Sequence, residues 1–148
     1  MKEWPKFNES GDLPIGIHRA TLAEVIDHFG RGSHQRAIVA QRLEHIYSLA
    51  SQTRKVARFI IFGSFVTTKI FPQDVDIFLL MDDTFDVRKV KGEAAIIFNH
   101  MPAQNYEGAS IFWVRRMAAF GGEDEAITFW QVKRNGERRG IVEVISND

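Results

Sequence analysis

The sequence predicts an α+β fold in which a mixed β-sheet of about four to five strands is flanked by helices. Two apolar runs rich in β-branched and aromatic residues, 56–62 and 74–81, are separated by a short stretch of polar and apolar residues. A similar run covers 109–115, and an Asn-Gly pair at 135–136 lies between two β-type runs near the end of the chain. Short runs of this kind are typical of buried strands, and the Asn-Gly pair is typical of a hairpin turn.

The length of 148 residues predicts one domain covering 1–148, large enough to bury a core without disulfides or metals. We expect residues 1–55 to form an extended lead-in followed by two helices. Residues 56–148 then form the core sheet and a C-terminal hairpin at 130–145. The helices precede the sheet as an N-terminal helical part.

Composition excludes several classes of function. The formal net charge is zero, so contact with nucleic acid depends on a local basic patch. The chain has no cysteine, which excludes disulfides, thiol nucleophiles and cysteine zinc sites and fits a reducing compartment. The N-terminal residues lack the apolar region of a signal peptide, and no apolar run is long enough to span a membrane. We therefore expect a cytoplasmic protein without a membrane anchor.

The first 55 residues contain clear helix signals. Residues 1–14, with two prolines and a glycine, are expected to be extended. Thr21 and Glu24 form a capping-box pattern that begins a helix ending near Phe29. After a Gly-Arg-Gly-Ser turn at 30–33, apolar residues at helical spacing predict a longer helix to about residue 52.

Two carboxylates at the start of the second apolar run are the strongest functional signal. In a strand, Asp74 and Asp76 point to the same face because successive side chains alternate. Like charges so placed repel each other, and a divalent cation would relieve that repulsion. A site made only of oxygen ligands suits Mg²⁺ or Mn²⁺. The alternative is a strand end whose carboxylates face solvent, beside a serine that caps a helix.

The turn before these carboxylates is suited to phosphate binding. Gly63 permits a sharp bend and a close approach of the backbone to a ligand. Ser64 then begins a predicted helix at 65–70, where its hydroxyl caps an amide or contacts a phosphate. Pro72 closes that helix. Lys69 is a candidate to neutralise phosphate charge, or else a solvated lysine.

The Gly-Ser pair, nine intervening residues and Asp-Val-Asp-Ile resemble the signature of the DNA polymerase β-like nucleotidyltransferase superfamily, of the minimal type. The match covers residues 59–81. The resemblance implies Mg²⁺ or Mn²⁺ as cofactor and an NTP as substrate. It implies transfer of NMP to a hydroxyl on a protein or RNA acceptor, in some members as part of a toxin–antitoxin pair with a toxin-like partner.

Active members of that superfamily usually carry a third carboxylate on a neighbouring strand. The predicted strand at 109–115 has Ser110 and Phe112 at the candidate positions and no acid. Glu143, flanked by apolar residues, is the leading replacement, and Glu107 is the second. Glu143 is equally consistent with an outward-facing residue on an edge strand. Two functions therefore stay open: an enzyme, or a binding module that senses nucleotide or neutralises a partner protein.

The second half of the chain contains weaker signals. Residues 87–98 are expected to be helical with a weak point at Gly92, and residues 100–105 to form a loop. Residues 123–129 form a short helix or lead into a strand. Four basic residues surround the predicted hairpin turn and either bind a polyanion or solubilise the turn: Lys133, Arg134, Arg138 and Arg139.

Overall fold

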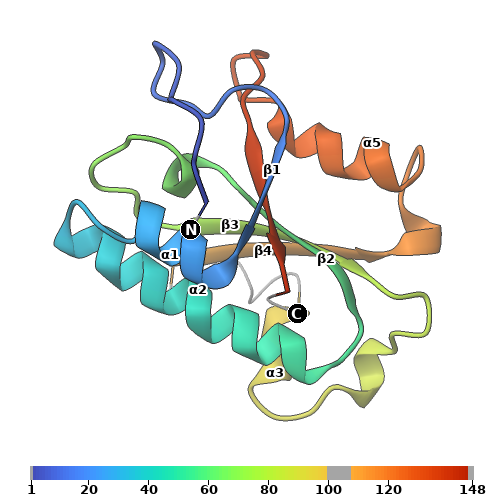
Figure 1. Ribbon diagram of the computed structural model, residues 1–148. Helices are drawn as coiled ribbons and strands as arrows, with labels where there is room; N and C mark the ends of the chain where they lie inside the picture. The colour runs from blue at the N-terminus through green and yellow to red at the C-terminus, as the bar shows by residue number, and fades with distance from the viewer. Residues whose placement is uncertain (1, 100–107, 147–148) are drawn as a thin grey trace.

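A single five-stranded sheet organises the chain (Figure 1). The computed structural model describes residues 2–99 and 108–146. Across the sheet the strand order is β1 (Ile17–Thr21), β5 (Ile141–Ile145), β2 (Val56–Phe62), β3 (Val75–Met81) and β4 (Ala109–Arg115). β1 runs parallel to β5, and β3 runs parallel to β4, whereas β2 is antiparallel to both of its neighbours. The predicted α+β fold with a mixed sheet flanked by helices is therefore confirmed.

Helices cover both faces of this sheet. The α-helices are α1 (Leu22–Phe29), α2 (His34–Gln52), α3 (Ala94–Ile97) and α5 (Glu123–Thr128). Single 3₁₀ turns form η1 (Ser64–Val66), η2 (Val87–Lys89), η3 (Arg116–Ala118) and η4 (Phe129–Gln131). None of the helices in the described ranges combines the length and the apolar character needed to cross a membrane.

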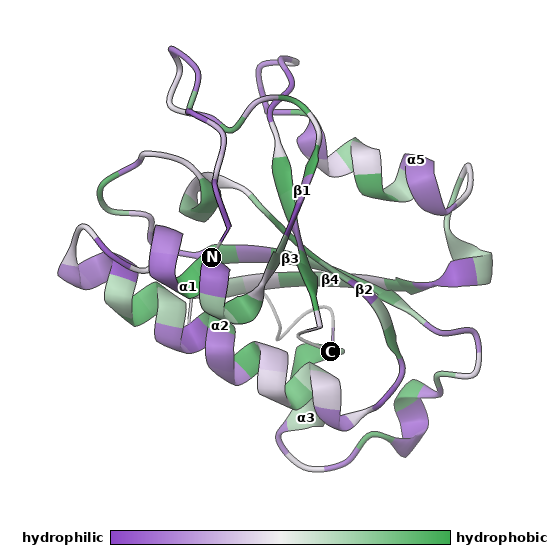
Figure 2. Ribbon diagram, in the orientation of Figure 1, coloured by the Kyte–Doolittle hydropathy of each residue, from purple (hydrophilic) through white to green (hydrophobic). Residues whose placement is uncertain are grey.

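The strands alternate between two apolar cores. Phe59 and Ile61 of β2 pack against the side covered by α1, α2 and α3, whereas Ile60 belongs to a smaller cluster with Ile127 of α5. The strands are mainly apolar along their length, whereas α2 shows apolar and polar residues in turn (Figure 2). Fully burying one large apolar side chain stabilises a fold by about 1.5–3 kcal/mol. Both cores therefore hold the sheet in place beneath the loops at its ends.

The two N-terminal helices begin as the sequence predicts. The Thr21 hydroxyl accepts a hydrogen bond from the Glu24 amide (3.2 Å), and the Glu24 carboxylate accepts one from the Thr21 amide (2.9 Å). Ser33 caps α2 by accepting from the Arg36 amide at 3.1 Å. Each cap satisfies an amide that a helix start leaves without an internal partner.

The sequence interpretation missed β1. This edge strand is five residues long, interrupts its apolar character with His18 and Arg19, and leads directly into the cap of α1. Its register with β5 places Arg19 opposite Glu143. Because β1 belongs to the sheet, the first 55 residues do not form a separate helical part in front of the core.

The predicted hairpin at 130–145 is wrong in its pairing. A turn does form, since the Gly136 amide donates to the Lys133 carbonyl (3.0 Å) with Gly136 at φ +87°. The first arm, however, is the 3₁₀ turn η4, and β5 inserts between β1 and β2. Trp130 explains the difference, because its ring packs on the sheet face against Phe62 and Phe112 instead of continuing a strand.

Two predicted helices are shorter than expected. The helix predicted at 65–70 is reduced to η1, since the carbonyls of Phe65, Thr67 and Lys69 accept hydrogen bonds from the Arg36 side chain. The helix predicted at 87–98 is divided into η2 and α3, with Gly92 at φ +68° between them. The predicted loop at 100–105 lies outside the described residues.

Candidate functional site

The glycine bend lies directly against the carboxylate of Asp76. Gly63 follows β2 with φ +81°, a conformation that disfavours any residue with a Cβ. A Cβ added to Gly63 would overlap the Asp76 carboxylate. Phe62, the last residue of β2, is the ladder partner of Asp76. The structure therefore brings together two features that the sequence places thirteen residues apart, the bend and the second acid.

Replacing this glycine tests the contact. Gly63→Ala is expected to lower the free energy of unfolding by about 2–4 kcal/mol, because backbone strain and steric overlap add. Urea denaturation measures the change. Gly92→Ala is the matched control: Gly92 also has positive φ, but apart from its chain neighbours no described residue has an atom within 4 Å of the position that its Cβ would occupy. We expect a loss of about 1 kcal/mol there. Equal losses at the two positions would contradict close packing of Gly63 on Asp76.

The two carboxylates interact electrostatically. Asp74 is exposed just before β3, and Asp76 is half-buried within it. Burial, and then the charge of Asp74, raise the pKa of Asp76 to about 6. The charge of Arg139, a hydrogen bond from Ser110 and the charge of Arg134 oppose that rise. Asp76 is therefore a carboxylate that a nearby cation would stabilise.

The neighbouring strand supplies a serine at this level of the sheet. Ser110 of β4 is the ladder partner of Asp76, and its hydroxyl hydrogen-bonds the carboxylate. Ser110 is one of the two positions on this strand where the resemblance leads us to expect a third acid. Among the described residues no group of three or more His, Cys, Asp or Glu side chains is placed to hold a metal ion. Two carboxylates therefore form the acidic part of the described site.

The structure does not bring Glu143 to this pair. Glu143 pairs with Ile60 on β2, whereas Asp76 pairs with Phe62, so the two acids share a sheet face but lie two strands apart. Ladder spacings place them about 12 Å from each other. Glu143 is only 7% exposed and accepts hydrogen bonds from Arg58 (2.9 and 2.8 Å) and Arg19 (3.3 Å). Glu107, the second candidate, lies outside the described residues.

Ser64 and Lys69 flank the bend with different surroundings. Ser64 begins η1, and its carbonyl accepts from the amide and hydroxyl of Thr67 (3.2 and 2.7 Å). Because η1 is a single turn, it lacks the dipole that a full helix would direct at a phosphate. The exposed Lys69 ammonium makes no ion pair with a described residue. Within the described part of the chain, neither side chain forms a hydrogen bond or an ion pair with Asp76.

Sequence reasoning missed Arg36, which holds the segment after the bend. Its guanidinium is buried (6% exposed) and donates to the carbonyls of Phe29, Phe65, Thr67 and Lys69 at distances from 2.6 to 2.9 Å. Burial lowers the pKa of Arg36. Its position at helical spacing from the buried Val39, Ala40 and Leu43 was the available signal, because an arginine on the buried face of a helix needs internal acceptors.

The N-terminal segment also reaches the site. Asp12, 3% exposed, binds the Lys133 ammonium (2.8 Å) and the Arg139 guanidinium (3.3 Å). Asp12 forms a β-bridge with Thr67, just beyond the bend. The N-terminal segment, the bend segment and the basic loop at 133–139 therefore meet on one side of the sheet.

A surface hollow opens beside Asp74. It has a volume of about 350 Å³ and includes Arg42, Phe71 and Gly108 in its lining. A larger hollow of about 850 Å³ lies between α1 and α2 and contains none of the predicted site residues. Asp74 is therefore accessible in a surface hollow whose lining does not include the half-buried Asp76.

Comparison with protein families identifies the family to which the chain belongs. A family model described as "Family of unknown function (DUF6932)" matches residues 5–145. The chain belongs to this family. The DUF6932 match spans all five strands and every predicted site residue. No curated protein matches the chain, and no solved structure matches it. The resemblance to nucleotidyltransferases thus rests on residues 59–81 of the sequence alone.

Proposed function

We propose that this DUF6932 protein binds Mg²⁺ or Mn²⁺ with a nucleoside triphosphate and transfers NMP to a hydroxyl of a protein or RNA. The observation that supports this proposal most strongly is the packing of the Gly63 bend against Asp76, next to Asp74. A ligand at this edge would meet a closely approaching backbone and two carboxylates together. The spacing of these features in the sequence is that of the nucleotidyltransferase signature.

The residues present fit a divalent cation. Asp74 and Asp76 are neighbouring acids whose mutual repulsion helps raise the pKa of Asp76, and a cation would reverse that effect. Their oxygens are the ligand type that Mg²⁺ and Mn²⁺ prefer, with phosphate and water oxygens completing the shell. The cation would neutralise charge on the phosphate oxygens during transfer.

The proposed reaction is a nucleotidyl transfer. The acceptor hydroxyl oxygen forms a bond to the α-phosphorus, the bond from that phosphorus to the bridging oxygen breaks, and pyrophosphate leaves with the electron pair. The hydroxyl proton passes to a carboxylate. Asp74, the more exposed of the pair, is open to a large acceptor docked at the edge of the sheet. An open site suits a macromolecular acceptor such as RNA or a toxin-like protein.

A second candidate function is supported by the acids near the site. Ser110 occupies the position expected for a third acid, and Glu143 is paired with Arg58 and Arg19. A site with two carboxylates suits a binding module that holds a metal–nucleotide complex without completing catalysis. Such a module would sense nucleotide or neutralise a toxin-like partner protein.

Nucleotides labelled at one of two phosphorus positions distinguish the two functions. The purified protein is incubated with Mg²⁺ or Mn²⁺, cell lysate, and each NTP labelled at either the α- or the γ-phosphorus. Nucleotidyl transfer is expected to attach α-label and no γ-label to an acceptor, and Asp76→Asn is expected to lower the yield at least about 100-fold. Protease and ribonuclease digestion then identify the acceptor as protein or RNA.

Each outcome separates the candidates. Binding of an NTP without transfer of label from any of them favours the binding module. Transfer of γ-label indicates phosphoryl transfer and contradicts the proposed reaction. Failure to bind any NTP in the presence of either metal contradicts both functions.

A further inference from the structure

A metal ion held by Asp74 and Asp76 would not be enough to neutralise the phosphate charges of a bound nucleotide. Two carboxylates already offset the charge of one divalent cation, so the phosphate chain of an NTP needs other cations. Lys69 is exposed on the segment after the bend. Four cationic residues lie close together in the sequence on the loop between η4 and β5, at 133–139.

This basic loop is built rigidly onto the site. A β-bridge joins Val132 to Arg138, and the Arg139 amide donates to the Gln131 carbonyl at 2.8 Å. Asp12 anchors the loop through its ion pairs with Lys133 and Arg139. The bridge from Asp12 to Thr67 connects the same anchor to the segment that follows Gly63. The loop is therefore fixed relative to the acidic pair through backbone as well as ionic contacts.

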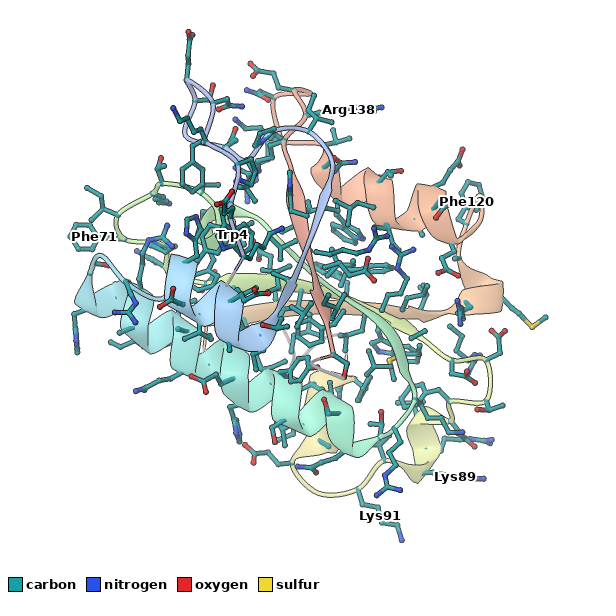
Figure 3. The ribbon with its side chains drawn as sticks, in the orientation of Figure 1. Trp4, Phe71, Lys89, Lys91, Phe120 and Arg138 are labelled. Carbon is teal, nitrogen blue, oxygen red and sulfur yellow. The ribbon has the colours of Figure 1, made fainter. Side chains whose placement is uncertain are left out.

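Individual side chains of the loop differ in their orientation. Asp12 pairs with Arg139 and forms a bridge with Thr67, which places the base of the loop beside the segment that follows Gly63. Burial raises the pKa of Asp76, and the charges of Arg139 and Arg134 oppose that rise. Arg139 is held by Asp12, whereas Arg134 is exposed and forms no ion pair with a described residue. Arg138 lies at the outer end of the loop and projects into solvent (Figure 3). Arg134 thus has its donors available on the anchored loop, whereas Arg138 projects outward from the end of that loop.

We propose that Arg134, supported by Arg139, binds the phosphate chain of the nucleotide, which makes the Asp12-anchored loop the phosphate-binding element of this site. This inference rests on the proposed function, because it concerns the same nucleotide. A guanidinium group presents a fixed fork of donors that matches two phosphate oxygens. Arg139 uses one terminal nitrogen on Asp12 and retains further donors.

Binding constants for ligands that differ only in phosphate content test the proposal. Calorimetry compares Mg·ATP, Mg·tripolyphosphate and AMP on the full chain, with Arg134→Gln as the variant and Arg138→Gln as the matched control from the same loop. Arg134→Gln is expected to weaken ATP and tripolyphosphate about 10- to 100-fold. We expect AMP to change less than about 2-fold, and Arg138→Gln to change each ligand less than about 2-fold.

The alternatives give different patterns. Equal weakening by Arg134→Gln and Arg138→Gln would show a general charge effect and overturn the inference. If Arg134→Gln binds ATP and tripolyphosphate as tightly as the wild type, the inference is wrong while nucleotide binding stands. If the wild type binds neither ligand, the proposed function itself fails. Loss of binding to a short single-stranded RNA, with tripolyphosphate unchanged, would assign the loop to a nucleic-acid acceptor and overturn the proposal.

Discussion

Arg36→Met is expected to lower the free energy of unfolding by about 2–5 kcal/mol. Methionine keeps the volume on the buried face of α2 but leaves four backbone carbonyls without their donor. A buried acceptor without a partner costs about 1–3 kcal/mol. The cost of burying a guanidinium group is removed at the same time, and water reaches the partly exposed Lys69 carbonyl, so the four penalties do not simply add.

Thermal and urea denaturation measure this effect, which corresponds to a decrease in Tm of roughly 5–15 °C. Arg31→Met is the matched control, because Arg31 is exposed and, among the residues in the described ranges, forms an ion pair only with Asp27. We expect a change below about 0.5 kcal/mol there. Comparable losses for the two variants would show that the carbonyl contacts of Arg36 contribute little to stability.

Asp76→Asn is expected to stabilise the unliganded protein at pH 7.5 by about 1–3 kcal/mol while abolishing stabilisation by Mg·ATP. The pKa of Asp76 is raised from 3.8 to about 6 in the folded protein. Between these values the folded state binds more protons than the unfolded state, so the free energy of unfolding falls as the pH rises from about 4 to 6. Asparagine removes this charge penalty and retains hydrogen-bonding capacity toward Ser110.

The pH dependence of stability shows whether the gain in Asp76→Asn comes from the ionisation of Asp76. The gain in stability of Asp76→Asn should be full above about pH 6 and mostly lost at about pH 4, where Asp76 is protonated in the folded and nearly half protonated in the unfolded protein. Glu44→Gln, an exposed acid on α2, serves as control and should leave the profile unchanged. A gain that is the same at both ends of this pH range would contradict a raised pKa. Equal Mg·ATP stabilisation of the variant and the wild type would contradict metal binding at Asp76.

The local patterns in the sequence predicted much of the fold. β2, β3 and β4 lie where the apolar runs predict them, and the capping box of Thr21 and Glu24 begins α1. These features depend on neighbouring residues, which is why they can be recognised without tertiary structure. β1 and the partners of β5 could not be recognised in this way, because these strand pairings depend on contacts between residues more than about eighty positions apart.

The candidate site, like the fold, could be predicted from the sequence only in part. Strand alternation predicted that Asp74 and Asp76 share one face, but β3 begins at Val75 and Asp74 lines a hollow with Arg42 of α2, so the shared face stays a prediction. A glycine was the natural residue for the bend before them. Only the tertiary structure could show that Glu143 is paired with Arg58, that Ser110 lies beside Asp76, and that Asp12 anchors the basic loop.

By itself, the sequence determined β2, β3 and β4 of the central sheet, the first two helices and the presence of two neighbouring acids, since each follows from propensity and periodicity within a short window. The tertiary structure decided which charges meet. Buried charged groups must find partners wherever the fold brings them, and Arg36, Glu143 and Asp12 each find theirs on segments distant in the chain.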